Sequence, residues 1–355
     1  MSVSSSFQTL LKNPYIVYGF YFLFSIWFVG TWIATADAPL RSFEPEDGTE
    51  FSALMDGTAT RPVAYRVLIP TIVHSFLNIL PEASRREMAN TIGSNGKIMK
   101  EMQRLNLSPH RIFEYAAAFL LVFILFFGTL IMLRAIILQY YSGDPIFIAL
   151  FPCASVLLLP PFFGSGPHYI YDLPTLFFLT GGLFLMFNGR WIFYYLLFLA
   201  GCLNKETAIF LFAAFVFVQY HSMKRKEFFR HSILHMLIGT GAILIVRWIY
   251  AANPGTGMEF HLHANIHFLM MGYSVVSLLF ILLALWMIGR GFSTIPGPIR
   301  NASVIVIPFL GVWSVGGLFY EPRAIYEVIF IANIFIVHTI FHTLWMKVQP
   351  NQSFL

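Results

Sequence analysis

This sequence predicts an all-α, polytopic membrane protein of about ten transmembrane helices, with residues 1–355 forming a single membrane domain. The first observation is composition: 57% of the 355 residues are hydrophobic and only 11% are charged. A soluble globule carries about a quarter of charged residues and cannot hide this much apolar surface in one core. The second observation is that the apolar residues form runs close to the ~20 residues that a spanning helix needs.

Ten such runs follow one another along the chain. The fifth and sixth are short and flank the polar residues Asn204, Lys205 and Glu206, so they predict either two thin helices or one broken hairpin. The first run is longer than the apolar region of a usual secretory signal, so we expect an uncleaved anchor. The runs are 15–34, 112–136, 146–162, 170–187, 191–203, 206–220, 231–250, 268–289, 302–319 and 325–346.

The orientation depends on residues 66–80, RVLIPTIVHSFLNIL, which are apolar enough for a short span but contain Pro70 and His74. If this run spans, the basic residues between 224 and 230 lie outside, against the positive-inside rule. We therefore expect residues 66–80 to lie along the membrane interface, with 81–90 as a second interfacial helix. Residues 35–111 then form one long outer loop, and both termini are cytoplasmic.

The charge distribution agrees with this orientation. It places ten bases and two acids on the inner side, and the remaining twelve bases and fifteen acids on the outer side. The net charge of +5 therefore reflects topology. No soluble basic face or recognition motif indicates a nucleic-acid partner. We expect an integral membrane protein that contacts membrane lipids.

The first half of the outer loop is acidic. A loop of this length in a compact protein is more often functional than filler. Carboxylates just beyond a helix end can bind a divalent cation or act as a general base, although exposed carboxylates are also common on solvated loops. The acids are Asp37, Glu44, Glu46, Asp47, Glu50 and Asp56.

Polar residues at the ends of apolar helices form a second set of candidates. In PPFFGSGPHYIYDLPTLFF, prolines break the helix, and His168, Tyr171 and Asp172 stand where the chain re-enters the bilayer. Charge at this depth is costly and tends to be functional, but Asp172 alternatively caps the following helix. In GCLNKETAIF, Lys205 and Glu206 either form a pair that holds two helix ends together or belong to a site.

Two later connections carry further candidates. His261 and His263 in NPGTGMEFHLHANIH offer imidazoles to a metal, although no tight metal-binding spacing accompanies them and interfacial histidines are the other interpretation. Glu321 and Arg323 in FYEPRAIYEVIF form either an ion pair or an arginine site for a lipid phosphate. The metal candidates are Glu44, Asp47, His261 and His263.

Motifs of soluble enzymes are missing: the sequence has no P-loop, no G-x-G-x-x-G, no G-x-S-x-G and no H-E-x-x-H. We also expect none of the buried acids and none of the inverted symmetry that many ion-coupled transporters show.

Five short motifs together resemble a known family: DGTEF from Asp47, RPVAYRVLIP from Arg61, YDLPTL from Tyr171, NKETA from Asn204 and EPR from Glu321. An inside N-terminus, one span, a long acidic outer loop with interfacial helices and a many-span bundle accompany them. This pattern is similar to that of bacterial membrane proteins of the C-type glycosyltransferase (GT-C) superfamily, and the resemblance covers most of the chain.

The resemblance implies transfer of a sugar from a polyprenyl-phosphate donor to a glycan, lipid or protein acceptor at the outer face. It implies that Asp47 is the general base or a metal ligand. Glu46 is the alternative to Asp47, because the run Glu44-Pro45-Glu46-Asp47 is not a clean D-x-D or E-x-D. A divalent cation, Mg²⁺ or Mn²⁺, is accordingly a candidate cofactor.

The same resemblance implies that Arg66 or Arg323 holds the carrier phosphate, with Lys205 as another phosphate partner, and that Asp172 completes the catalytic set. The remaining residues expected in substrate binding are His168, Tyr171, Glu206 and Glu321.

The chemistry suits these residue types independently. Displacement of a lipid phosphate from an anomeric carbon needs a carboxylate that deprotonates the acceptor and a cation that neutralises the leaving phosphate. Two other classes remain open: a transporter or flippase of a lipid-linked sugar, which would expose polar groups on both sides, and a non-catalytic membrane scaffold.

Overall fold

The computed structural model describes residues 11–35, 50–104, 108–160, 163, 168–257, 260–272, 274–345 and 349–350. Helices make up about 80% of this part of the chain. Two strands of two residues each, β1 (Tyr141–Ser142) and β2 (Gln349–Pro350), pair antiparallel. The all-α prediction is therefore confirmed for the described residues.

Each of the ten apolar runs corresponds to a helical stretch. Six stretches are long and apolar enough to cross a membrane, which makes the chain an integral membrane protein. They are α2 (Pro14–Thr35), α7 (Ile112–Tyr140), α12 (Arg225–Ile249), α14 (Val275–Phe292), the continuous segment Gly297–Gly316, and α17 (Tyr326–Trp345). The segment Gly297–Gly316 joins α15 (Gly297–Ala302), η5 (Ser303–Ile305) and α16 (Val306–Gly316).

The other four stretches are shorter apolar helices of 10–17 residues. They are α8 (Pro145–Val156), α9 (Pro174–Phe187), α10 (Trp191–Asn204), and η4 (Glu206–Phe210) continued by α11 (Leu211–Gln219). The fifth and sixth predicted runs are thus two separate short helices that meet at Lys205.

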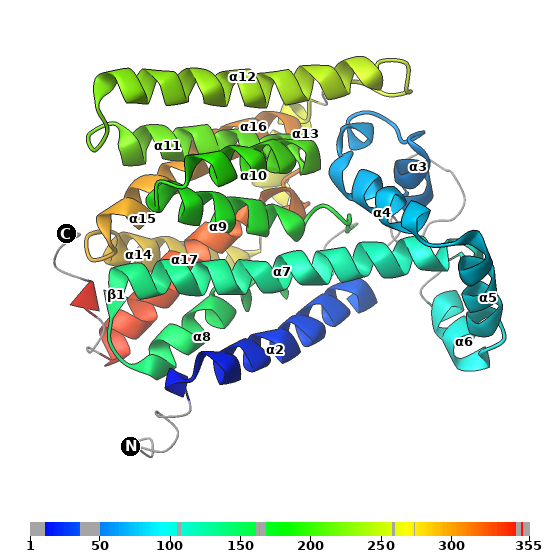
Figure 1. Ribbon diagram of the computed structural model, residues 1–355. Coiled ribbons are helices and arrows are strands. Elements are labelled where there is room, and N and C mark those ends of the chain that lie inside the picture. Colours follow the sequence, from blue (N-terminus) through cyan, green and yellow to red (C-terminus); the bar gives the residue numbers. More distant parts are fainter. Residues whose placement is uncertain are drawn as a thin grey trace.

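Successive helices run back and forth, so the bundle has two distinct ends (Figure 1). The connections at residues 157–160, 168–173, 205 and 250–257 lie at the end where residues 50–104 and 108–111 pack, which we call the first-loop end. The connections at 141–144, 188–190 and 220–224 lie at the other end, beside the start of α2, which we call the terminal end.

The first-loop end carries several short helices. The predicted interfacial helices at 66–80 and 81–90 correspond to α4 (Leu68–Ile79) and α5 (Glu82–Gly93). The sequence did not predict α3 (Phe51–Asp56), η1 (Val63–Tyr65), α6 (Gly96–Arg104) or η2 (Pro109–Arg111). In Figure 1, α3 and α4 lie beside the first turns of α7, and α5 and α6 lie beyond its end.

Helix α4 is apolar on two faces, which explains why it resembled a short span. Ile69, Val73 and Leu77 are buried and pack toward α7, whereas Phe76 and Ile79 are exposed. A helix of this kind uses one face to hold the protein together and offers the other to an apolar environment such as a membrane interface.

A hydrogen-bonded latch fixes the segment that leads into α4. The Asn253 side chain donates to the carbonyls of Gly57 and Ala59 at 2.9 and 2.8 Å, and the Arg61 backbone N–H donates to Pro254 at 2.8 Å. Gly255 has φ +90°, and a Cβ there would lie 2.7 Å from the Arg61 carbonyl oxygen, so only glycine fits. The connection after α12 therefore sets the course of the chain just before Arg66.

A second polar latch holds the short helix α13 (Leu262–Met271), which precedes α14. Asn265 donates to the carbonyls of Ser314 and Gly317 at 3.1 and 2.7 Å, and its side-chain oxygen accepts from the Phe319 backbone at 3.0 Å. These bonds satisfy two carbonyl groups and one N–H group of the backbone where α16 ends. Burying such groups without a hydrogen-bond partner would cost free energy.

The two-ended arrangement predicts opposite labelling of two serine positions. Ser94, between α5 and α6, and Ser222, between α11 and α12, are both exposed and lie at opposite ends of the bundle. In intact cells, a membrane-impermeant maleimide should label Ser94→Cys, and it should label Ser222→Cys only after permeabilisation. The native Cys153 and Cys202 are buried, so they give little background. Equal labelling of both variants in intact cells would contradict this topology.

Candidate functional site

Four chain segments bring charged side chains together at the first-loop end. They are the short connection between η1 and α4, the residues before α9, the junction of α10 with η4, and the first turn of α17. Their ionisable side chains, which we call the charged cluster, are Arg66, Asp172, Lys205, Glu206 and Glu327.

The buried half of the cluster centres on Lys205. Its Nζ lies 3.4 Å from Glu327 Oε1 and 3.9 Å from Asp172 Oδ1. The side chains are 7%, 3% and 1% exposed for Lys205, Glu327 and Asp172. One ammonium group thus holds two buried carboxylates from α17 and from the segment before α9, because isolated charges at this burial would be too costly.

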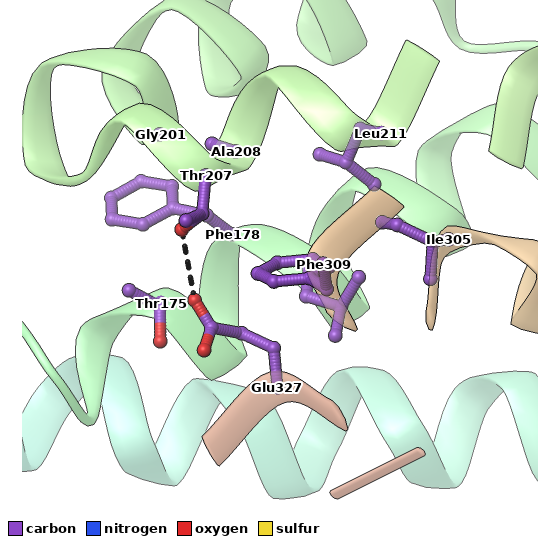
Figure 2. Close-up of a pocket in the computed structure, with 10 residues that line it drawn as sticks. Thr175, Phe178, Gly201, Thr207, Ala208, Leu211, Ile305, Phe309 and Glu327 are labelled. Atoms are coloured by element: carbon purple, nitrogen blue, oxygen red, sulfur yellow. Dashed lines mark hydrogen bonds between the residues drawn. The ribbon is translucent and has the colours of Figure 1, made fainter. Parts of the chain in front are cut away.

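Glu327 makes a further contact with the turn that carries Lys205. Thr207 Oγ1 donates to Glu327 Oε1 at 3.1 Å, as Figure 2 shows. The first turn of α17 is therefore tied to η4 by an ion pair and by a hydrogen bond. Gly201 of α10 lets η4 and α9 pack closely at this turn. A Cβ at Gly201 would lie 3.1 Å from Ala208 Cβ and 3.2 Å from Phe178 Cβ.

The more accessible half of the cluster centres on Arg66. Its guanidinium carbon lies 4.6 Å from the centre of the Tyr171 ring, Nη1 donates to the Tyr171 hydroxyl at 3.2 Å, and Nη2 lies 3.6 Å from Glu206 Oε2. The Arg66 and Glu206 side chains are 15% and 25% exposed. These are the two charged groups of the cluster that a ligand reaches most readily.

The surroundings of Arg66 keep it charged. Burial on its own lowers the pKa of the guanidinium, but the neighbouring Tyr171, Glu206 and Asp172 outweigh burial and raise the pKa above its ordinary value. The group therefore carries its positive charge throughout the physiological pH range.

The backbone around Asp172 is held by its own hydrogen bonds. Asp172 Oδ2 accepts from the Tyr169 backbone at 3.1 Å, Thr175 Oγ1 donates to the Asp172 carbonyl, and the Asn204 amide donates to the Tyr171 carbonyl at 3.0 Å. The N-cap of α9 is Leu173, with no side-chain cap bond. The capping interpretation of Asp172 is therefore wrong, since its carboxylate turns back to Tyr169 and toward Lys205.

The alternative in which Lys205 and Glu206 pair with each other to join two helix ends is also corrected. The two residues are neighbours in sequence but have different partners: Lys205 pairs with Asp172 and Glu327, and Glu206 pairs with Arg66. The turn does join helix ends, but through partners on three other segments.

Helix lengths place this turn at depth. A 14-residue helix such as α10 is about 21 Å long, whereas the hydrocarbon core of a bilayer is about 30 Å thick. The 29-residue α7 is about 43 Å long and extends past α9 and α10 at the first-loop end (Figure 1). With the start of α10 at one membrane surface, Asn204 and Lys205 lie below the other surface, where charges persist only when paired.

A pocket adjoins the buried half of the cluster. Its empty volume is about 270 Å³, including open solvent, and Glu327, Thr207 and Thr175 form its polar edge among apolar side chains of α9, α11 and α16 (Figure 2). Leu179 also lines a second pocket of about 490 Å³, formed by apolar side chains of α7, α9, α17 and the α15–η5 segment. Both pockets are lined mainly by apolar side chains, and we call the two pockets together the apolar slot.

The cluster carries two cations and three carboxylates, so it is formally net negative when all five groups are ionised. Among the described residues, no three His, Cys, Asp or Glu side chains are grouped closely enough to hold a metal ion. A metal site would need donors from elsewhere. The metal candidates Glu44 and Asp47, and the catalytic candidate Glu46, lie outside the described residues.

The contacts known for several other candidate residues lie outside the charged cluster. The His168 ring is buried and stacks on Trp32 at 5.5 Å, where it helps pack α2. The backbone N–H of His261 donates to Val315, and His263 is exposed on α13. Glu321 and Arg323 stand just before and within η6 (Pro322–Ile325), the turn that leads into α17. The contacts of the cluster come instead from Glu327.

Glu327 and Thr207 were missed at the sequence level. Glu327 occupies the first turn of α17 and is 2% exposed. The expectation that the helices carry no buried acid is therefore wrong. An acid followed by the apolar run VIFIANIFIV was visible in the sequence and indicates a paired or functional carboxylate. Nothing in the sequence pointed to Thr207, whose role depends on the position of Glu327.

Comparison of this chain with protein-family models, with curated proteins and with solved structures finds no match. The candidate site therefore stands on the geometry of its own residues.

The buried half of the cluster predicts a large stability loss when Lys205 is removed. Lys205→Met leaves Asp172 and Glu327 buried without a cation, which should lower the free energy of unfolding by about 3–5 kcal/mol. The double variant K205M/E327M should lose less than the sum of the single losses, because one uncompensated charge is removed with its partner. Denaturant unfolding in detergent measures all three. The exposed Lys97→Met is the matched control, and strict additivity of the two losses would contradict the pairing.

Proposed function

We propose that this protein is a membrane glycosyltransferase that moves a sugar from a polyprenyl-phosphate donor to an acceptor at the outer face of the bacterial inner membrane. The observation that carries the proposal is the contact of Arg66 with Tyr171 and Glu206 at a recessed end of an apolar bundle. It supplies a permanent cation and a carboxylate side by side, with an apolar slot close by.

Convergence of the family-like motifs supports the same proposal. Segments RPVAYRVLIP, YDLPTL and NKETA are well separated in the sequence, yet Arg66 of the first contacts Tyr171 of the second and Glu206 of the third. The segment EPR leads into α17, whose Glu327 contacts Lys205 from NKETA. The resemblance to the GT-C superfamily thus involves residues that are neighbours in space.

In the proposed reaction, a carboxylate takes the proton from the acceptor hydroxyl. At the same time, the oxygen of that hydroxyl forms a bond to the anomeric carbon of the donor sugar. The bond between that carbon and the phosphate oxygen breaks, and the phosphate leaves with the electron pair. Arg66 neutralises the charge that develops on the leaving phosphate. Because its pKa is raised, this contribution does not titrate at physiological pH.

The proposed general base is Asp47, with Glu46 as its alternative, and Glu206 is the partly exposed carboxylate beside Arg66. Asp172 and Lys205 are engaged with each other at depth, so we assign them to positioning the turn that carries Glu206. Tyr171 holds Arg66 through its ring and its hydroxyl. Arg323 is the second candidate for binding the phosphate. His168 and Glu321 remain proposed binding residues.

The apolar slot between α7, α9, α11 and α17 is the proposed place for part of the donor's prenyl chain. Its lining is apolar apart from its edge at Glu327, Thr207 and Thr175 and the hydroxyls of Thr180 and Ser303. A divalent cation would offset the net negative charge of the cluster, but the described residues do not complete a site for one. The mechanism therefore includes no step that depends on a metal.

One observation favours transport of a lipid-linked sugar as the second candidate function. Glu327 is a buried acid in a spanning helix and pairs with Lys205, an arrangement that proton-coupled carriers use. Two facts favour transfer: the cluster lies at one end of the bundle, and its carboxylate Glu206 is accessible beside a cation.

The function itself is tested by comparing three cell lines: one with the intact gene, one with a deletion and one with a stably expressed Asp47→Asn variant. Mass spectrometry of surface glycans and lipid-linked sugars should show one sugar missing in both altered lines, with its prenyl-linked donor accumulating. An unchanged profile in the deletion would contradict glycosyl transfer. A loss confined to the deletion would exclude Asp47 as the base.

Arg66 is tested with a series that changes its charge and shape. Arg66→Gln should lower sugar transfer roughly 10²- to 10³-fold, because one donor to the developing charge is lost. Arg66→Lys should lose less, because it keeps the charge but not the two-pronged geometry. The exposed Lys97→Gln on α6 is the matched control and should behave as the wild type. Thermal unfolding checks that each variant is folded, and full transfer by a folded R66Q would contradict the assignment.

A further inference from the structure

We infer that the outward face of α12 carries a binding site for one anionic phospholipid, with its headgroup at Lys226 and Arg230 and an acyl chain along Ile233 and Leu237. This site lies at the terminal end of the bundle. It is independent of the proposed transfer reaction.

The helical positions carry the first step. His231, His235 and Gly239 are buried on one face of α12, with Ala242 and Val246 continuing it. At 100° per residue, Lys226 and Arg230 lie on the opposite face, directly in line with Ile233 and Leu237. The two cations and the apolar stripe therefore share one side of the helix.

Exposure carries the second step. Ile233, Leu237 and Leu244 are 56%, 65% and 59% exposed, so this stripe has no protein neighbour over most of its surface. Lys226 and Arg230 are exposed, and none of the ion pairs between described residues involves either of them. Both cations are thus available to a ligand that also covers the stripe.

Depth in the membrane carries the third step. Trp248 lies on the same face at the far end of α12 and is 81% exposed. The rise from Lys226 to Trp248 is about 33 Å, close to the ~30 Å thickness of the hydrocarbon core. The cations therefore lie at one headgroup level and Trp248 at the other, where aromatic side chains concentrate.

The neighbouring residues make this level positive. Lys224 is the N-cap residue of α12 and Arg225 is its first residue. The first backbone N–H groups of the helix add the positive end of the helix dipole. Glu227 is the one acid in the first turn, and it lies about 100° around the helix from Lys226. The exposed Phe229, one residue before Arg230, adds an aromatic ring at the same level.

These features select an anionic phospholipid as the occupant. A soluble anion would satisfy the cations but would leave the apolar stripe uncovered, and a zwitterionic lipid would bring its own positive group toward Lys226 and Arg230. An anionic headgroup gains from each nearby cation by about a fivefold factor in affinity.

The test is a lipid titration of the delipidated full-length protein in detergent, followed by native mass spectrometry. Phosphatidylglycerol and phosphatidylcholine with the same acyl chains serve as probes. The wild type should bind a first phosphatidylglycerol more tightly than phosphatidylcholine. The variant K226Q/R230Q should lose roughly 25-fold in that affinity and should bind phosphatidylcholine as before.

Two further variants make the result specific. K226R/R230K keeps both charges and should keep the preference for phosphatidylglycerol. K97Q/K100Q removes two exposed cations from α6 at the opposite end and should also keep it. Equal affinity of the wild type for the two lipids, or an undiminished preference in a folded K226Q/R230Q, would overturn the site.

Discussion

Lys205 is the cation that, among the described residues, pairs with both buried carboxylates of the charged cluster. Its ammonium group lies between Asp172, just before α9, and Glu327, at the start of α17, and its own backbone forms the turn between α10 and η4. All three side chains are nearly inaccessible, and the ammonium group offsets part of the cost of burying the two carboxylates. These ion pairs therefore hold the adjoining ends of α9, α10, η4 and α17 together at the first-loop end.

The position of Arg66 and Glu206 follows from this arrangement. Glu206 is the next residue after Lys205, so the ion pairs that hold the turn also aim Glu206 at Arg66. Arg66 is also fixed by the latch between Arg61 and the connection after α12, and by its contact with the Tyr171 ring. The buried ion pairs of Lys205 therefore help to fix the positions of the more accessible Arg66 and Glu206. Pairing of this kind allows charged residues to remain within an apolar bundle.

The two ends of the molecule use charge differently. The charged cluster at the first-loop end is paired and formally net negative, its buried half centres on Lys205, and it lies beside the apolar slot. At the terminal end, the cations of α12 are outward and exposed above a lipid-facing stripe. The proposed chemistry and the proposed lipid contact are thus separated by the length of the spanning helices.

The sequence alone determined the helical membrane class, the ten apolar stretches, and the candidates Arg66, Tyr171, Asp172, Lys205 and Glu206, because apolar run length and the cost of buried charge are local properties that a sequence displays. Only the tertiary structure decided how those residues pair, that Glu327 and Thr207 join them, that Asp172 does not cap α9, and that α3 and α6 form. Pairing depends on which helix ends meet, and that is a property of packing between segments up to 155 residues apart, as for Asp172 and Glu327. The short helices depend on the same packing, since six or nine residues are too few to hold a helix by themselves.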